Sequence, residues 1–255
     1  MDAAQTIRDC LADVAALRLH RAGDPALGAA VTRIKALQAR RFRGTYADLM
    51  DSATFGPATR FFLEELYSDS DYSDRDQQFG RIAGTLQSLF PQPVVDTALA
   101  LAVLHAQTEA LDQDMGRAWL ATGASATAPS ADSPSQEAAR YTAAWRRVGQ
   151  TPARLLQLQR VLAMGTDLAR LTRTPGLRML LRMMRAPAHA AGLGALQRFL
   201  EAGFDTFGQL ARQRGRVAQF LATIDERERA LIVLMTDADL VACETQLTRT
   251  LGQAR

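Results

Sequence analysis

Lysine is almost absent from this sequence: Lys35 is the only lysine among 30 basic residues, and all the others are arginine. A Walker-type phosphate loop, a Schiff-base enzyme or a kinase strand would each have to use that one residue. Lys35 lies within 33–37, a stretch with helical spacing and no glycine loop beside it. We therefore expect no chemistry that depends on a catalytic lysine.

Cysteine and long apolar runs are also scarce. Cys10 and Cys243 lie near opposite ends of the chain without a C-x-x-C spacing, which is typical of a reducing compartment. The N-terminal residues include early acids and no apolar run of signal-peptide length. The longest weakly charged stretch, 91–110, is interrupted by charged residues, so we expect a cytoplasmic protein with no transmembrane segment.

Catalytic signatures are missing as well. The chain has three histidines and no G-x-S-x-G, H-E-x-x-H or Walker pattern. The glycines of 192–197 match only part of the dinucleotide fingerprint and follow a helix rather than a strand. With 47% hydrophobic and 22% charged residues, the composition is that of a folded globular chain. We expect no cofactor and lean towards a protein that is not an enzyme.

What is present is helical periodicity along most of the chain. Start and stop signals divide it into about ten helices, and we expect an all-α fold, an irregular multi-helix bundle with one flexible internal linker. Asp24 caps a helix with Pro25 at its first position, and Gly44 is expected to close that helix. A long helix is predicted from Val94 to about Leu120.

Further start signals follow. Residues 73–76 read Ser-Asp-Arg-Asp, which has the S-x-x-D form of an N-terminal cap. Thr151-Pro152 and Thr174-Pro175 each combine a capping residue with a proline at the first helical position. The second of these pairs predicts a helix that runs to about Arg185.

The stretch 124–135 has no large apolar residue. This composition predicts a flexible linker at about 123–136 between helical halves 1–122 and 137–255. We expect a single all-α domain over 1–255, because the halves carry opposite charge and neither has enough long amphipathic helices to close its own bundle.

Charge is distributed unevenly. The net charges of 1–43, 44–139, 140–216 and 217–255 are +4, −10, +11 and −2, within a total of +3. Complementary segments of this kind favour packing against each other, in one molecule or across a dimer. The alternative is that the basic segment meets an external anion.

The basic segment contains an arginine stripe at helical spacing. Its members, which we take as candidates for binding a partner or anion, are Arg170, Arg173, Arg178, Arg182 and Arg185. Leu177, Leu180, Leu181 and Met184 lie opposite the stripe. Such a short basic amphipathic helix can dock on acidic protein, grip phosphates or lie on anionic lipid. Nucleic acid is a weaker alternative because no aromatic residue interleaves the arginines for stacking. Lipid is weaker because a helix of about 11 residues is short for a membrane anchor.

An acidic surface is predicted from Asp69, Asp71, Asp74 and Asp76. A calcium loop starting at Asp69 fails, because position 6 would be Asp74 instead of glycine and position 12 would be Gly80 instead of glutamate. We interpret the segment as a solvated helix start.

His105, Glu109 and Asp112 follow i, i+4, i+7 spacing on the long helix, within about 60° of one face. This stripe is the alternative metal or acid/base site, with Glu64 or Glu65 as further donors. Di-iron bundles need a second Glu-x-x-His motif, and the chain has none. The simpler interpretation is a histidine at the edge of the core, bonded to a neighbouring carboxylate.

The sequences 61–67 (FFLEELY), 73–76 (SDRD) and 191–204 (AGLGALQRFLEAGF) together resemble a family of uncharacterised all-helical proteobacterial proteins. The resemblance covers most of the chain apart from the linker. It implies a bacterial cytoplasmic protein without an assigned activity, and it supplies no catalytic residues.

From these observations we expect a non-catalytic interaction or regulatory protein. Its acidic (44–139) and basic (140–216) surfaces would mediate self-association or the docking of a protein partner. The alternative is a helical ligand- or metal-binding protein, or an enzyme, with a His/carboxylate site on the helix 94–120.

Overall fold

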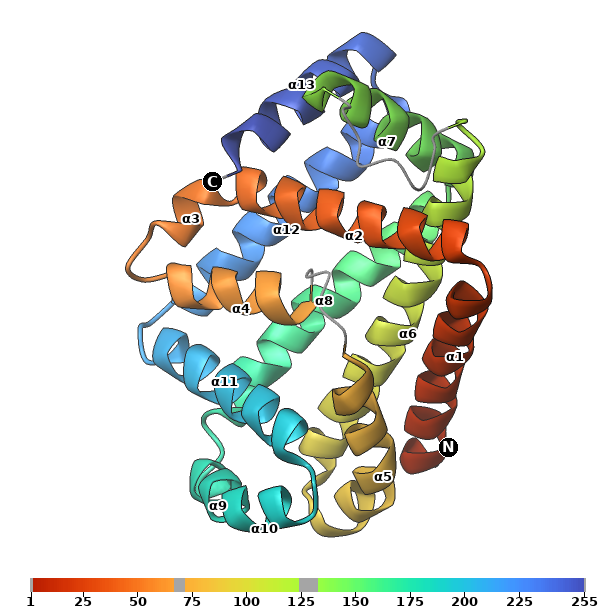
Figure 1. Ribbon diagram of the computed structural model, residues 1–255. Coiled ribbons are helices and arrows are strands. Elements are labelled where there is room, and N and C mark those ends of the chain that lie inside the picture. The colour runs from red at the N-terminus through yellow and green to blue at the C-terminus, as the bar shows by residue number, and fades with distance from the viewer. Residues whose placement is uncertain (1, 67–71, 124–132, 255) are drawn as a thin grey trace. The chain divides into compact units, whose positions relative to one another are not determined.

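The computed structural model describes residues 2–66, 72–123 and 133–254. It is 86% helical, and these residues form thirteen helices and no strands, which confirms the all-α prediction (Figure 1). The helices are α1 (Ala3–Gly23), α2 (Pro25–Thr45), α3 (Ala47–Met50), α4 (Gly56–Leu66), α5 (Ser73–Leu89), α6 (Gln92–Leu120), α7 (Pro134–Val148), α8 (Thr151–Leu171), α9 (Leu177–Met183), α10 (Arg185–Ala190), α11 (Gly194–Ala211), α12 (Arg216–Asp237) and α13 (Leu240–Gln253).

The chain divides into two compact units. Unit 1 comprises Met1–Ala15, Ser70–Gln107 and Gln159–Thr223, and unit 2 comprises Ala16–Asp69, Thr108–Leu158 and Ile224–Arg255. Each unit takes segments from both sequence halves, 1–122 and 137–255. The helices α1, α6, α8 and α12 supply residues to both units.

Several helix boundaries agree with the local sequence signals. Asp24 is the N-cap of α2, and its side chain accepts a hydrogen bond from the backbone N–H of Leu27. The Thr174-Pro175 prediction is wrong: Gly176 adopts φ +77°, so 174–176 form a turn. Two short helices, α9 and α10, follow that turn where one was predicted. The backbone freedom of Gly176 overrides the proline signal.

The helix start at 73–76 also differs in detail. Tyr72 is the N-cap of α5, without a side-chain cap bond, so Ser73 is the first helical residue and not its cap. The linker expected at about 123–136 lies mainly outside the described residues. Its last part belongs to α7, which begins at Pro134 and whose N-cap Ser133 forms a capping box with Gln136.

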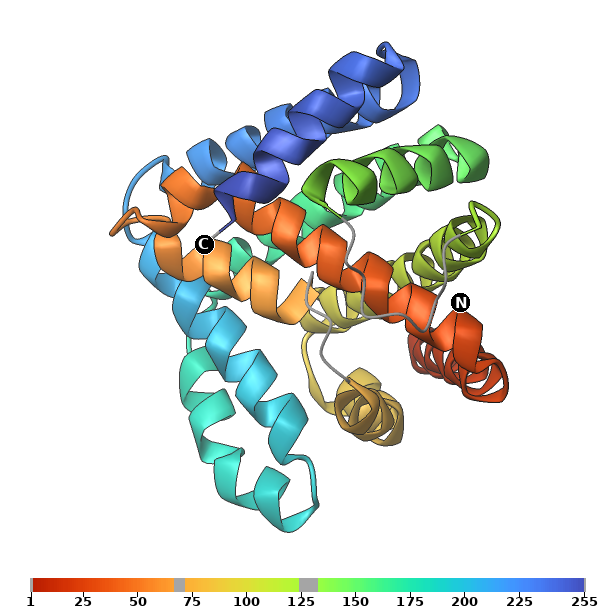
Figure 2. The same ribbon diagram turned by 45° about the horizontal axis from the view of Figure 1, so that its top comes forward.

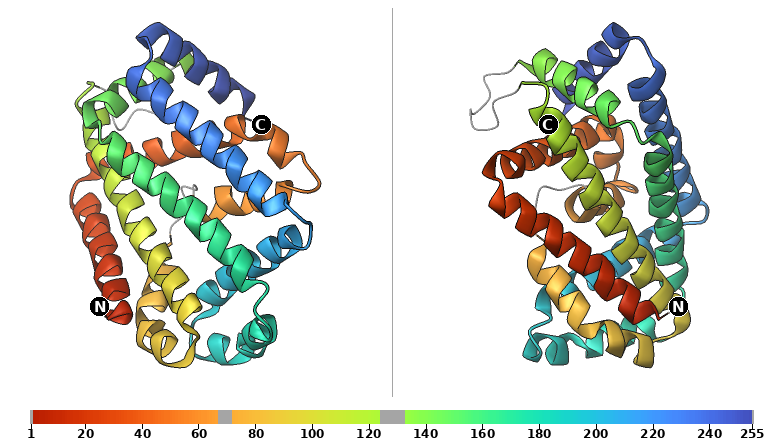
Figure 3. Two further views of the ribbon diagram at one scale, coloured as in Figure 1. Left: turned by 180° about the vertical axis from the view of Figure 1, so that it is seen from behind. Right: turned by 90° about the vertical axis from the view of Figure 1, so that its right-hand side faces the viewer.

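Unit 1 is built around α5 and α11. Its main core cluster joins Ile7 of α1, Phe79 and Leu86 of α5, Val95 of α6 and Leu196 of α11. Figure 3 shows α5 beside the first part of α1. The pair α9 and α10 packs along α11, as Figure 2 shows, over a smaller cluster of Leu171, Leu177 and Phe204.

Unit 2 is built around α2, which packs against α3, α4 and α13, while α13 also packs against α7. Gly44 does not close α2 as expected, because the helix continues to Thr45. Gly44 is buried within the helix. A Cβ atom on Gly44 would lie 1.9 Å from the carbonyl oxygen of Thr250 on α13. Glycine is therefore required here for the close approach of the two helices.

The helix α6 is the one helix among the described residues that is long and apolar enough to cross a membrane. Its most apolar window has a mean hydropathy of 1.2 and is 33% buried. Length and composition alone are weak grounds, because the core helix of a water-soluble protein can meet them too. The absence of a transmembrane segment stays a prediction.

Candidate functional site

His105 bonds to Asp76 instead of the carboxylates that follow it on α6. Its Nε2 atom lies 2.8 Å from Oδ2 of Asp76, whose side chain is only 7% exposed. The ring of Tyr72 stands edge-on to the imidazole, with 6.4 Å between the ring centroids. All three residues belong to unit 1. Asp76, predicted as part of an acidic surface, is thus a buried partner of His105.

Glu109 is held between two cations of unit 2. Arg21 Nη2 donates to its Oε2 at 2.7 Å, and Lys35 Nζ donates to its Oε1. Burial by itself raises the pKa of Glu109, but Lys35 and Arg21 outweigh burial and lower that pKa to about 2. Glu109 is therefore ionised at neutral pH, and the one lysine of the chain is its counter-ion.

Asp112 has a different environment on the same helix. It is 5% exposed and accepts a hydrogen bond from Gln38 Nε2 at 3.0 Å. Burial raises the pKa of Asp112 above its ordinary value; the charge of Lys35 opposes the rise, and that of Glu109 adds to it. A raised carboxyl pKa is found in general acids and also in structural polar clusters.

The proposed metal stripe does not converge on one point. His105 faces Asp76 in unit 1, whereas Glu109 and Asp112 bond to residues of α1 and α2 in unit 2. Within 2–66, 72–123 and 133–254, no three His, Cys, Asp or Glu side chains are grouped so that they could hold a metal ion. The described geometry gives the metal alternative no support.

Sequence reasoning missed a group of buried polar side chains around Asp112. Arg154 is 5% exposed, and its guanidinium carbon lies 3.5 Å from the ring centroid of Trp145. Burial lowers the pKa of Arg154 and raises that of Tyr141, and the charge of Asp112 acts on both groups. Tyr141 and Trp145 are four residues apart, so the sequence indicates one aromatic face of a helix. Nothing in it indicates that Arg154 and Asp112 would join that face.

Three atoms of this group have no hydrogen-bond partner among the described residues. They are Arg154 Nη2, Trp145 Nε1 and Gln113 Oε1. A buried polar atom without a partner costs about 1–3 kcal/mol. Within the described part of the chain, all but three of the buried polar residues belong to unit 2, so its interior is more polar than that of unit 1.

The rest of the predicted acidic surface is only partly described. Asp69 and Asp71 lie outside the described residues, and Asp74 is exposed in the first turn of α5. Other acids of the segment 44–139 are engaged inside unit 2. Glu137, for example, is 5% exposed and paired with Arg33 and Arg40.

The predicted arginine stripe lies in unit 1 and is exposed. Three of its members form local ion pairs: Arg170 with Asp167 at 2.9 Å, Arg178 with Asp205 at 2.7 Å and Arg185 with Glu201 at 2.6 Å. Arg173 and Arg182 are exposed as well. Asp167, Glu201 and Asp205 are the only acids among residues 140–216, which contain fourteen basic residues. The segment therefore keeps a large positive excess.

Apolar side chains are exposed between these arginines. Met179 is 67% exposed and Met183 64%, while Leu180 and Met184 are about one-third exposed at 37% and 36%. Leu177 is buried, and Leu181 packs against the cluster at Phe204, so only these two of the four apolar residues opposite the stripe pack into the core of unit 1. We name the exposed surface the Met/Arg face. Its members are Arg178, Met179, Leu180, Arg182, Met183, Met184 and Arg185.

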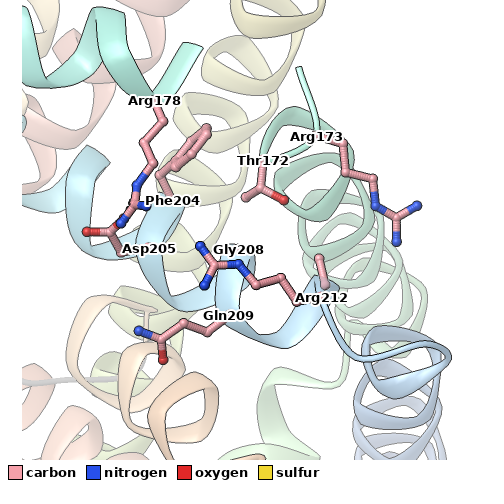
Figure 4. A pocket seen from close by; sticks show the side chains of 9 residues that line it. Thr172, Arg173, Arg178, Phe204, Asp205, Gly208, Gln209 and Arg212 are labelled. Carbon is pink, nitrogen blue, oxygen red and sulfur yellow. Dashed lines mark hydrogen bonds and ion pairs between the residues drawn. The ribbon is translucent and has the colours of Figure 1, made fainter. Parts of the chain in front are cut away.

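A cavity of about 200 Å³ lies beside this face, between the end of α8, α9 and α11. Its lining includes Arg173, Arg178, Asp205 and Arg212, with Phe204 and Gly208. In Figure 4 the Arg212 side chain extends across Gly208 towards Asp205, while Arg173 points away. The Arg178–Asp205 pair lies at the cavity, with side chains 46% and 43% exposed.

The described residues thus define an all-α protein. Unit 2 has a polar interior, and unit 1 carries the Met/Arg face, on which basic and apolar side chains are both exposed. The chain belongs to the family described as "Domain of unknown function (DUF8198)", whose model matches residues 17–240. Searches of curated proteins and of solved structures find no match. This match confirms the expectation that the chain belongs to a family without an assigned activity.

Proposed function

We propose that the protein is a non-catalytic interaction module that docks an acidic, partly apolar segment of another protein onto the Met/Arg face. One observation carries the proposal: Met179 and Met183 are about two-thirds exposed on a helix whose arginines lie beside them. Exposed apolar groups rimmed by charge are typical of protein-binding surfaces.

The composition of the face favours a protein over a membrane or a nucleic acid. Methionine side chains are flexible and polarisable, and they are common on surfaces that adapt to a bound segment. The helix α9 has only seven residues and no aromatic side chain, so it is short for an interfacial lipid anchor and lacks the aromatic residues that such anchors carry. The Met/Arg face has no aromatic side chain on which the bases of a nucleic acid could stack.

The charges favour an acidic partner other than a second copy of this chain. All three acids of 140–216 are paired with arginines of that segment, and Arg173 and Arg182 are exposed beside them, so an acidic partner would meet a net positive surface there. Asp76, Glu109, Asp112 and Glu137 of the acidic segment are buried within their own units. These four acids are therefore not accessible to a neighbouring copy.

We also propose that the protein acts in the bacterial cytoplasm, as the motifs at 61–67 and 191–204 suggest. Neither Cys10 nor Cys243 forms a disulfide, which is compatible with a reducing compartment. The alternative function, binding of a small ligand, is favoured by the cavity at Arg212.

The proposal is tested with a fluorescent twenty-residue amphipathic helix that carries leucine on one face and glutamate on the other. We expect saturable binding that weakens at least tenfold in the Met179→Ser/Met183→Ser double variant, because the apolar contact is removed. Val233→Ser is the matched control, since Val233 is 57% exposed in unit 2. Fluorescence anisotropy at 50 and 200 mM salt measures both effects.

Two further measurements separate the other occupants. Binding of anionic lipid vesicles in place of the peptide would show that the face meets a membrane. A dimer mass in light scattering that the double variant abolishes would show self-association. Either outcome, or equal peptide binding by wild type and double variant, would overturn the proposal.

A further inference from the structure

We infer that the cavity beside the Met/Arg face binds the phosphate group of a small molecule, with Arg178 and Arg212 as its cationic ligands. Asp205 then acts as an internal anion that the phosphate replaces. This ligand site goes beyond the proposed protein docking and does not depend on it.

The lining residues suit a doubly charged tetrahedral anion. Guanidinium groups donate in a fixed fork that matches phosphate oxygens, and Arg178 and Arg212 both line this cavity. Figure 4 shows the Arg212 guanidinium directed towards Asp205, the same carboxylate that Arg178 Nη2 reaches at 2.7 Å. The carboxylate therefore marks where an anion is favoured.

The internal ion pair can be exchanged at little cost. Both side chains are more than two-fifths exposed, and exposed pairs contribute only about 0–1 kcal/mol. A phosphate carries about twice the charge of a carboxylate and three strong acceptor oxygens. It therefore gains more from Arg178 and Arg212 than Asp205 does.

The size and walls of the cavity limit what else the ligand can contain. About 200 Å³ is less than a typical drug-sized site, so a phosphate with a small organic group fits and a large cofactor does not. Phe204 is 9% exposed and packed in a core cluster with Leu171 and Leu177, so it cannot swing out to stack on a base. A small phosphate ester is favoured over a nucleic acid.

The experiment titrates the whole protein with inorganic phosphate and with pyrophosphate by calorimetry, at constant ionic strength and with sodium chloride as the balancing salt. We expect Arg212→Gln to weaken binding at least tenfold. Asp205→Asn should tighten it several-fold, because the competing carboxylate is removed. Arg229→Gln is the matched control, because Arg229 is an exposed arginine of unit 2 with its own Asp225 partner outside the cavity.

The Met179→Ser/Met183→Ser variant separates this site from the docking proposal, because it should lose the acidic peptide and keep phosphate. Equal phosphate affinity in Arg212→Gln and Arg229→Gln would overturn the inference. So would an Asp205→Asn variant that gains nothing. A single-stranded RNA oligonucleotide that binds more tightly than pyrophosphate, with Arg212→Gln without effect, would assign the basic segment to nucleic acid instead.

Discussion

Glu109 and Asp112 lie three residues apart on α6, are both buried, and have pKa values shifted in opposite directions. Glu109 receives direct hydrogen bonds from Lys35 and Arg21, whereas Asp112 receives one from the neutral amide of Gln38. Burial disfavours both carboxylates, but only Glu109 has enough adjacent positive charge to outweigh it. The contributions of these two acids to the stability of the fold therefore depend on pH in opposite directions.

Replacing Glu109 with glutamine should destabilise the protein by about 2–4 kcal/mol at pH 7, because Lys35 and Arg21 would lose the charge that compensates their burial. The folded pKa of Glu109, about 2, is below its ordinary value of 4.5. Its contribution is therefore present above pH 4.5 and is lost as the pH falls towards 2. Urea unfolding of wild type and variant between pH 3 and 7 measures the difference.

Asp114→Asn is the control for this prediction. Asp114 pairs with Arg117 at 3.3 Å on the exposed side of α6, with side chains 36% and 53% exposed. Such a pair contributes about 0–1 kcal/mol. If both variants lose the same free energy of unfolding, burial of Glu109 does not have the effect assigned to it.

Asp112→Asn should show the opposite pH dependence. The folded pKa of Asp112 is raised above 3.8, so its unfolded form ionises first as the pH rises. The stability that Asp112 contributes is complete below about pH 3.8 and is lost as the pH rises through the folded pKa. We expect the free energy of unfolding of the wild type to fall relative to that of Asp112→Asn from about pH 4 upwards. A difference that grows in favour of the wild type would contradict the assignment.

His105→Asn should cost about 1–2 kcal/mol, the value of one hydrogen bond to a buried carboxylate. His20→Asn, a change at an exposed position of α1, should stay within about 0.5 kcal/mol. We expect added zinc or manganese to leave the melting temperature of the wild type unchanged. A metal-dependent rise that His105→Asn and Asp112→Asn both erase would restore the metal interpretation.

Gly44→Ala should destabilise unit 2 by about 2–3 kcal/mol, because the added methyl group forces α2 away from the α13 backbone. Gly84→Ala provides the contrast. A Cβ on Gly84, within α5, would meet only Arg8 Nη1 at 3.9 Å, so that change should stabilise by about 0.5–1 kcal/mol. Thermal melts of the two variants test whether packing or helix propensity decides each case.

Local signals predicted the helical class and many helix ends, because their causes lie within a few residues of each other. Asp24 with Pro25 is one example, and its cap bond to Leu27 forms as expected. The role of Gly44 was predicted wrongly. Glycine is required there because of a carbonyl group on α13, about two hundred residues further along the chain. A glycine that ends a helix and one that admits a neighbouring backbone look the same in sequence.

The candidate site could be predicted less well for the same physical reason. Helical spacing correctly indicates that His105, Glu109 and Asp112 share one side of α6, yet their partners come from α5, α1 and α2. Which acid meets a cation depends on how those helices pack. The arginine stripe was found because charge composition is a property of the sequence itself, whereas the exposure of Met179 is not.

The placement of Lys35 also determines how the protein responds to amine-directed reagents. Its ammonium group is the only side-chain amine of the chain, is 17% exposed, and donates to Glu109. An activated ester can acylate it only after that bond opens and the ammonium loses its proton, and acylation removes the positive charge, so the ion pair with Glu109 cannot form again. The rate of acylation at Lys35 therefore reports the local opening of unit 2 at a single chemical position.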